Sequence, residues 1–314
     1  MGRRIVRRRP ALLVLGAFLL LLAGCGAAEF RAALERLVEY SGWQDQQILF
    51  VRGSTSDKTI NEIYVMDVNG NNPRKLTQNS VEDKDPCWSP DRSLIVYATL
   101  NTTDFELAVM TPAGAFVGYL TEDGGDSHDF QPAWSPGGDR VAYTHWQNPN
   151  QVYVKDANLG ATESRITDLS ANEAFPDWSP DGSEIVFMSQ RDGGDWDIMV
   201  LEVAVPANIR QLTANGSDDR NPSWSPDGQR ITYHSNEDGD YEIYTVNADG
   251  TGGKLNLTAN TVYSDQSPDW SPDGKKIVFQ SNRDGNWEIY SMNPDGSEQT
   301  RLTYNEADDI SPCW

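Results

Sequence analysis

Six carboxylate side chains recur along the chain, each five residues before a tryptophan. They are Asp83, Asp129, Glu173, Asp219, Asp265 and Asp309. If loops bring all six to one face of the fold, these like charges need cations, protons or hydrogen bonds to balance them. One hypothesis is an acidic mouth that binds a divalent cation or a cationic segment of a partner. The other is that each carboxylate caps backbone N–H groups of its own loop, and the two hypotheses are compatible.

Aromatic residues occupy the loops that we expect on the same face. They are Phe105, Trp146, Trp196, Tyr241 and Trp287. Exposed aromatic rings around a polar mouth suit a protein or glycan partner, whereas the alternative is that the rings pack against neighbouring strands. Trp146 is the best candidate for an exposed ring, because its loop over residues 145–150 departs from the repeat pattern.

The usual catalytic motifs are missing. The sequence has no Gly-x-Ser-x-Gly elbow, no His-Glu-x-x-His motif and no phosphate-binding loop. Its three histidines, His128, His145 and His234, fall in different repeats. We therefore expect a binding protein with no resident cofactor rather than an enzyme. Metal-dependent catalysis and glycan cleavage by a pair of carboxylates stay open as alternatives.

The elements that position these residues follow from a repeat. Pro-x-Trp occurs six times, ending at Trp88, Trp134, Trp178, Trp224, Trp270 and Trp314, with steps of 46, 44, 46, 46 and 44 residues. The unit over residues 270–303 holds a Ser-Pro-Asp-Gly turn, two β-branched and aromatic runs and a short Leu-Thr segment, separated by further turns. A period of about 40–50 residues with four short strands predicts a propeller blade. We predict an all-β, six-bladed β-propeller of four-stranded antiparallel blades over residues 46–314, with the tryptophans packed between blades.

The two ends of the repeat region predict how the ring closes. The chain enters at residues 46–51, which match the second strand of later units, and it ends at Ser311-Pro312-Cys313-Trp314. The C-terminal segment therefore supplies the innermost strand of the first blade. Cys87 and Cys313 both directly precede a repeat tryptophan and fall in adjacent blades. They form either a disulfide that staples the closure or two buried free thiols.

The N-terminal segment reads as a targeting signal. Five arginines precede an apolar run over residues 11–22, and Leu22-Ala23-Gly24-Cys25 resembles a bacterial lipobox. We expect a signal peptide over residues 1–24, lipidation of Cys25, and a linker with a short amphipathic helix within residues 25–45. Without the leader, 20 basic residues stand against 47 acidic ones, a formal charge of −27 that disfavours nucleic acid.

The Trp-Ser-Pro-Asp-Gly core, the Ile-Val-Phe strand and the Glu-Ile-Tyr strand resemble the WD-like propeller repeats of the TolB family, over roughly residues 46–314. Two repeats depart from the pattern, with Asp91-Arg92 and Gly137-Gly138 in place of Asp-Gly. The resemblance implies a propeller that binds a peptidoglycan-associated lipoprotein. It does not extend to the family's separate N-terminal α/β domain or to that domain's link to the TolA protein, and a lipid anchor is a further departure.

Together these features predict a monomeric, exported lipoprotein on the periplasmic or cell-surface side of a membrane. It would act as a non-enzymatic scaffold that binds an envelope or peptidoglycan-associated protein through the acidic, aromatic-rimmed face, and would touch the membrane through its lipid anchor only. The alternative is a propeller that binds or cleaves glycans with the carboxylates of the same face.

Overall fold

The computed structural model describes residues 47–53, 60–122, 127–168, 171–191, 194–259 and 262–314. The predicted signal peptide, the lipidated Cys25 and the helix within residues 25–45 lie outside the described residues. The described chain forms one compact unit from Gln47 to Trp314, built from strands. Across the ranges given above, no helix is long and apolar enough to cross a membrane.

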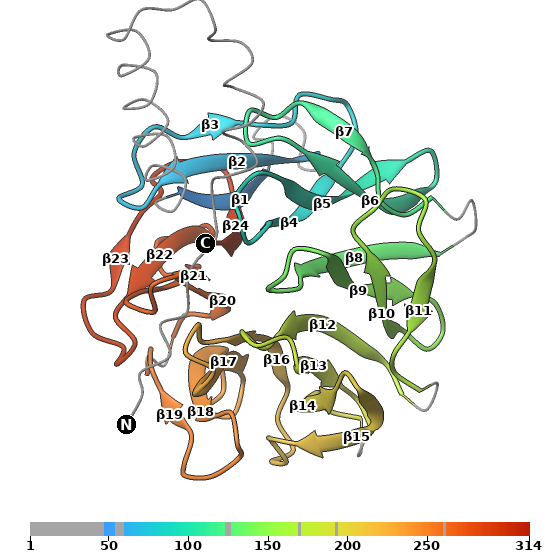
Figure 1. Cartoon of the computed structure of the whole chain (residues 1–314). Coiled ribbons are helices and arrows are strands. Elements are labelled where there is room, and N and C mark those ends of the chain that lie inside the picture. Colours follow the sequence, from blue (N-terminus) through green and yellow to red (C-terminus); the bar gives the residue numbers. More distant parts are fainter. Residues whose placement is uncertain (1–46, 54–59, 123–126, 169–170, 192–193, 260–261) are drawn as a thin grey trace, which may run out of the picture. The chain divides into compact units, whose positions relative to one another are not determined.

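The strands form six antiparallel sheets of four, arranged as blades around a central axis (Figure 1). From the axis outward, blade 1 holds β24 (Asp309–Cys313), β1 (Gln47–Gly53), β2 (Asn61–Asp67) and β3 (Arg74–Lys75). Blade 2 holds β4 (Asp83–Trp88), β5 (Ile95–Asn101), β6 (Asp104–Met110) and β7 (Phe116–Tyr119). Blade 3 holds β8 (His128–Trp134), β9 (Arg140–Trp146), β10 (Gln151–Asp156) and β11 (Glu163–Arg165).

The other three blades follow the same order. Blade 4 holds β12 (Glu173–Trp178), β13 (Glu184–Ser189), β14 (Asp197–Glu202) and β15 (Val205–Gln211). Blade 5 holds β16 (Asp219–Trp224), β17 (Arg230–Ser235), β18 (Glu242–Asn247) and β19 (Leu255–Asn256). Blade 6 holds β20 (Asp265–Trp270), β21 (Ile277–Ser281), β22 (Glu288–Met292) and β23 (Thr300–Arg301). The six-bladed propeller predicted from the repeat is therefore confirmed.

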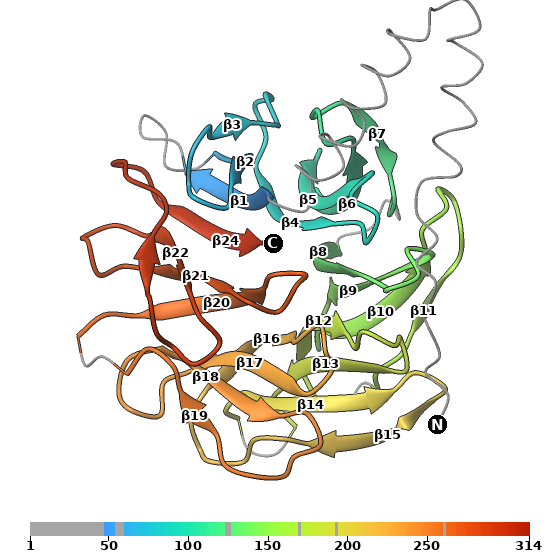
Figure 2. The same cartoon turned by 60° about the vertical axis from the view of Figure 1, so that its left-hand side comes forward.

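The ring closes through the C-terminal strand, as the sequence predicts. β24 pairs antiparallel with β1, with Leu49 opposite Cys313 and Arg52 opposite Asp309. Figure 2 shows β24 beside β1, at the point where the last blade meets the first. The strand that completes blade 1 thus comes from the opposite end of the chain.

The repeat tryptophans pack between blades. Trp224 is 6% exposed and lies in a cluster with Val186 of blade 4 and Ile231 of blade 5. Trp88 lies in the equivalent cluster with Leu49 of blade 1 and Ile95 of blade 2. Each of these large rings fills the wedge between two neighbouring sheets, so the hydrophobic core is distributed over the blade interfaces.

The Ser-Pro-Asp-Gly turn joins the first two strands of a blade. In blade 6, Ser271 Oγ donates to Asp273 at 2.9 Å and accepts the backbone N–H of Lys276 at 2.9 Å. Gly274 has φ +69°, a backbone conformation in which glycine has no steric penalty. In blade 2 Arg92 takes this position at φ 59°, and its guanidinium lies 5.1 Å from the centre of the Trp88 ring. The cation–π contact accounts for a side chain at a position that otherwise suits glycine.

Candidate functional site

One residue of every innermost strand has a left-handed backbone and lies next to the axis. It is the third residue before the repeat tryptophan: Asp85 (φ 48°), Gln131 (φ 50°), Phe175 (φ 54°), Asn221 (φ 49°), Ser267 (φ 52°) and Ser311 (φ 50°). In the innermost pairs of blades 2 to 6 the register shifts by one residue beside this position, as in a β-bulge. The shift turns the strand and places this residue of each blade at the channel wall.

Bonds between blades hold these residues in place. The N–H of Phe175 donates to Thr144 Oγ1 in the preceding blade at 3.0 Å, and the N–H of Ser311 donates to Gln280 Oε1 at 2.8 Å. The N–H of Gln131 donates to Asp85 Oδ2 at 3.3 Å. Because the backbone is bonded across each blade junction, the bulge residues sit on a rigid frame.

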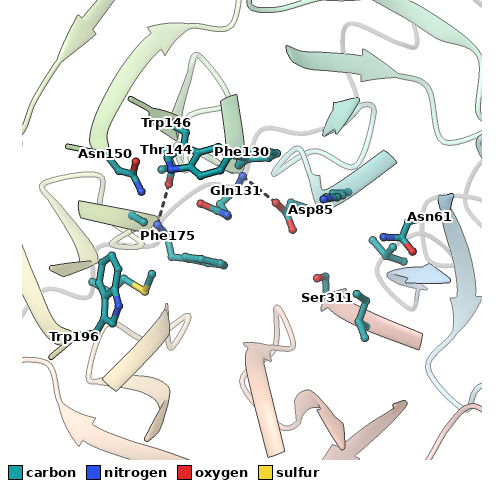
Figure 3. A pocket seen from close by; sticks show the side chains of 15 residues that line it. Asn61, Asp85, Phe130, Gln131, Thr144, Trp146, Asn150, Phe175, Trp196 and Ser311 are labelled. Carbon is teal, nitrogen blue, oxygen red and sulfur yellow. Dashed lines mark hydrogen bonds between the residues drawn. The ribbon is translucent and has the colours of Figure 1, made fainter. Parts of the chain in front are cut away.

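These residues line two connected spaces. A narrow axial channel of about 150 Å³ is bounded by residues 85–87, 131–133, 175–177, 221–223, 267–269 and 311–313. A wider cavity of about 540 Å³, here called the mouth, shares Asp85, Gln131, Phe175 and Ser311 with the channel. Figure 3 shows the mouth with Trp146 on one wall, Trp196 on another and Phe175 extending between them.

Trp146 is the exposed aromatic residue of the mouth. Its ring is 50% exposed and is held from behind by His128 at 5.3 Å and Phe130 at 5.9 Å between ring centres. Such a supported, half-exposed indole offers a large flat apolar surface at low entropic cost.

The other aromatic residues of the predicted rim divide into two groups. Trp196 lines the mouth, and the guanidinium of Arg220 lies 5.8 Å from the ring centres of both Trp196 and Tyr241. Phe105 is buried at 8% exposure, and Tyr241 and Trp287 are half-buried outside the lining of the mouth. The structure therefore brings together Trp146 and Trp196, with Phe130 and Phe175 added by the fold.

Two charged residues, Lys84 and Asp85, are among the described residues that line the mouth. Lys84 Nζ lies 3.2 Å from Glu82 and 4.7 Å from the centre of the Phe105 ring, so its charge is already compensated. Burial raises the pKa of Asp85 to about 6. At neutral pH Asp85 thus carries a negative charge at the point where the mouth narrows into the channel.

The six carboxylates are buried, whereas the hypothesis of an acidic mouth requires them to be open to a partner. Five of them are 0% exposed and Asp129 is 2% exposed. They lie at the start of the innermost strands, where neighbouring side chains are their partners. Partner binding by Asp83, Asp129, Glu173, Asp219, Asp265 and Asp309 stays a prediction, and their burial favours the structural interpretation.

Each buried carboxylate has polar side chains around it. Three contact cationic groups: Arg191 with Glu173, Arg283 with Asp265 at 2.8 Å, and Arg52 with Asp309 at 2.6 Å. Asp129 lies 2.8 Å from His145 Nδ1. Asp83 and Asp219 accept hydrogen bonds from Asn79 and Asn215, four residues earlier in the chain. Burial nevertheless raises the pKa of Asp219 to about 6, and it raises the pKa of Asp83, Glu173, Asp265 and Asp309 above the usual range of a carboxyl group.

Sequence reasoning missed the partners of these carboxylates. The threonine at the end of each short outer segment accepts the N–H of a third-strand residue, as Thr77 does from Ile63 at 3.0 Å. Several of these threonines also donate to a buried carboxylate, as Thr77 does to Glu62 at 2.6 Å. The repeated Leu-Thr-x-Asn pattern before Asp83, Asp219 and Asp309 was the available signal. A polar side chain repeated beside a repeated carboxylate indicates a hydrogen-bond network rather than an open surface.

Two further site predictions have simple outcomes. Cys87 and Cys313 are free thiols, so the disulfide considered from the sequence is not formed in the structure. Over the residues that the structure describes, no group of three or more His, Cys, Asp or Glu side chains gathers in a way that could hold a metal ion. A divalent cation at the mouth stays a prediction from the sequence.

A buried carboxylate in the channel predicts the pH dependence of stability. Asp177 accepts the N–H of Trp224 in the next blade at 2.7 Å and that of Trp178 at 2.9 Å. Burial, together with the nearby charge of Asp269, raises the pKa of Asp177 to about 7. A raised folded-state pKa means that the folded protein binds the proton more tightly than the unfolded chain. This contribution is therefore complete below about pH 4 and is lost as the pH rises through about 7.

We expect Asp177 to contribute about 2–3 kcal/mol to the increase in the free energy of unfolding when the pH is lowered from 8 to 5, measured by urea denaturation. Asp177→Asn should reduce this gain. Asp181→Asn is the matched control in the same blade, because hydrogen bonds from Ser183 and Ser179 lower the pKa of Asp181 and give its contribution the opposite sign. An equal gain in the wild type and in Asp177→Asn would contradict the assignment.

The fold and the mouth define a class: a six-bladed β-propeller with an axial channel and an aromatic cavity at an end of that channel. A family model described as the TolB beta propeller domain matches residues 98–263. The chain belongs to this family, which confirms the resemblance read from the repeats.

Relatives and solved structures agree. The chain is 31% identical over 145 residues to the protein TolB homolog of Chlorobium chlorochromatii, covering 46% of this chain and 31% of that protein. It is 28% identical over 163 residues to the Tol-Pal system protein TolB of Bordetella pertussis, covering 51% and 36%. The crystal structure of TolB from Acinetobacter baumannii aligns with a TM-score of 0.74 at 22% identity, over 86% of this chain and 66% of that one. The chain thus matches about a third of the length of these curated relatives, through their propeller repeats.

Proposed function

We propose that this chain is a non-enzymatic, protein-binding propeller of the bacterial cell envelope that docks a segment of an envelope protein in the mouth. The observation that carries the proposal is the cavity of about 540 Å³ with Trp146 and Trp196 on its walls. Tryptophans that line a concave surface are typical binding hot spots.

The charge of the mouth favours a particular kind of segment. Lys84 is paired with Glu82, which leaves Asp85 at the base of the cavity on a chain of strongly negative net charge. A peptide that places an apolar or aromatic side chain against Trp146 and a cationic one near Asp85 fits both features. The relatives described as Tol-Pal system proteins support an envelope or peptidoglycan-associated protein as the source of this peptide.

The N-terminal motif supports the proposed location. The arginine-rich leader, the apolar run and Leu22-Ala23-Gly24-Cys25 support export, cleavage before Cys25 and lipidation of its thiol. We therefore propose a monomeric lipoprotein held at a membrane by its acyl chains, with the propeller on the exported side.

A glycan is the second candidate ligand. Amide side chains from two blades, Asn61 of blade 1 with Gln131 and Asn150 of blade 3, line the mouth beside the exposed ring of Trp146. Amides next to a flat aromatic surface can hydrogen-bond sugar hydroxyls while the ring stacks on the sugar face. The capture experiment below separates the two candidates, because a polysaccharide and a discrete protein differ in their sensitivity to protease.

Trp146→Ala is expected to weaken partner capture by about tenfold or more, because the substitution removes the largest apolar surface of the mouth. The full-length protein, immobilised in detergent, would be incubated with envelope extract, and captured proteins would be identified and quantified by mass spectrometry. Asp85→Asn should weaken capture as well and should reduce its salt dependence.

Phe116→Ala is the matched control, since Phe116 is 56% exposed on the outermost strand of blade 2, far along the sheet from the axis. This variant should capture the partner as the wild type does. Equal capture by the wild type and Trp146→Ala would exclude the mouth as the docking site. Capture of protease-resistant polysaccharide alone would replace the protein partner by a glycan.

A further inference from the structure

Residues directly before the repeat tryptophans approach one another across blade junctions. Ser223 of blade 5 and Asp269 of blade 6 occupy this position, and Ser223 Oγ donates to Asp269 Oδ1 at 3.0 Å. Both residues line the axial channel. The fold therefore brings the side chains at this position in adjacent blades into direct contact.

At the junction between blades 1 and 2 the same position holds two cysteines. Cys313 lies on β24 opposite Leu49, and Cys87 lies on β4 opposite Val96. Cys87 Sγ lies 3.7 Å from the carbonyl oxygen of Trp88, and the neighbouring Cys87 thiol, together with burial, raises the pKa of the Cys313 thiol. Within the described ranges these are the two cysteines, and they meet at the junction where the ring closes.

Both thiols are placed where a small reagent reaches them. Each is half-buried and lines the axial channel. The other junctions hold no such pair: the equivalent residues are Ala133, Asp177, Ser223 and Asp269. The pair thus lies at the junction where the two ends of the propeller sequence meet. A covalent bond at this junction constrains the chain most.

We propose that Cys87 and Cys313 form a reversible disulfide that locks the ring at its closure. The oxidant is a disulfide, either of an envelope thiol oxidase or of a low-molecular-weight thiol. One cysteine thiolate attacks the oxidant disulfide and releases one thiol, and the second cysteine thiolate then displaces the other thiol to form the Cys87–Cys313 bond. The two cysteines lose two electrons and two protons, and the oxidant disulfide takes them up as two thiols.

The bond is expected to be strongly stabilising because it closes a long segment. Residues 87 and 313 are separated by 226 positions, and a cross-link over a long segment removes more conformational entropy from the unfolded chain than a short one does. We expect the oxidised protein to melt about 5–15 °C above the reduced protein.

The experiment uses the full-length protein, reduced with a phosphine and then equilibrated with glutathione disulfide. Tryptic peptides separated without reduction should contain the cross-linked pair of Cys87 and Cys313, at 2 Da below the mass of the two reduced peptides. The melting temperature of the oxidised sample should be higher, and adding the phosphine should reverse the change.

Cys87→Ser and Cys313→Ser are the matched variants, since each leaves one thiol of the pair and retains Cys25. Neither should show a phosphine-dependent melting temperature. The proposal is overturned if the wild type yields only mixed disulfides with glutathione, or if the cross-link forms without raising the melting temperature. Peptide mapping of the wild type gives this answer even if a serine variant fails to fold.

Discussion

Deletion of the last six residues, 309–314, is expected to abolish the folded propeller. The deletion removes the innermost strand of blade 1 and with it the two bonds from Arg52 to Asp309, at 2.6 and 2.7 Å. It also removes the bond from the N–H of Trp314 to Asp269 at 2.7 Å, which joins blade 6 to blade 1. Loss of a buried ion pair alone costs about 3–5 kcal/mol, and the total stability of a domain is only about 5–15 kcal/mol.

The measurement is thermal unfolding followed by circular dichroism, together with size-exclusion chromatography. We expect the truncated chain to show no cooperative transition and to associate, because the open edge of β1 would be free to pair with another chain. A truncated chain that melts cooperatively at the temperature of the full-length protein would show that closure of the ring is dispensable.

A rescue variant tests whether the missing strand itself is the cause. Residues 309–314 would be inserted before Gln47 and joined to β1 through a Ser-Pro-Asp-Gly turn of the kind that links the first two strands of blade 6. Because β24 and β1 are antiparallel neighbours, this connection suits the observed pairing. The rescued chain should regain cooperative unfolding while its new C-terminus ends at Asp308.

Replacement of Arg283 by methionine is expected to destabilise the protein by about 3–5 kcal/mol at pH 8. The guanidinium donates to both oxygens of Asp265, at 3.0 and 2.8 Å, and also contacts Gln299 at 2.7 Å. Methionine keeps an apolar chain against the Tyr290 ring but leaves Asp265, which is 0% exposed, without its cation. The main cost is therefore an uncompensated buried charge.

The pH dependence of this loss identifies its origin. Burial already raises the pKa of Asp265, and removal of the guanidinium raises it further. Acidification should therefore restore part of the lost stability, since Asp265 then takes up a proton in the folded state. Lys275→Met is the control in the same blade, because the Lys275 and Asp273 side chains are 79% and 56% exposed and solvent screens such a pair. A loss for Arg283→Met that does not diminish between pH 8 and pH 5 would contradict this explanation.

The fold could be predicted from the sequence because the patterns that indicate turns and strands repeat and agree with one another. The Ser-Pro-Asp-Gly turns, the β-branched runs and the period of the tryptophans all indicate four short strands per unit. The position of Cys313 opposite Leu49 follows from matching the two ends of the chain to one repeat. The outermost strands are the least regular: β15 spans Val205–Gln211, whereas β23 spans only Thr300–Arg301.

The site could be predicted less well from the sequence, because a repeat pattern does not indicate which side of a loop faces solvent. The sequence predicts loops around the axis for Asp219 and its equivalents, yet these residues start the innermost strands and are buried among polar partners. Phe175 and Gln131 were not singled out, since their approach to the axis depends on a left-handed backbone at the bulge. Trp146 was identified correctly as an exposed ring because its loop departs from the repeat.

The left-handed residue of each innermost strand gives the propeller six positions at which a substitution can change the ligand that it recognises. The backbone at these positions is set by the bulge and by bonds between blades, while the side chain varies from acidic to amide to aromatic to hydroxyl. A left-handed backbone costs a non-glycine residue on the order of 1 kcal/mol, and the chain carries this cost six times around one axis. Substitutions at these positions could therefore change the ligand preference one blade at a time, without disturbing the tryptophan packing that holds the blades together.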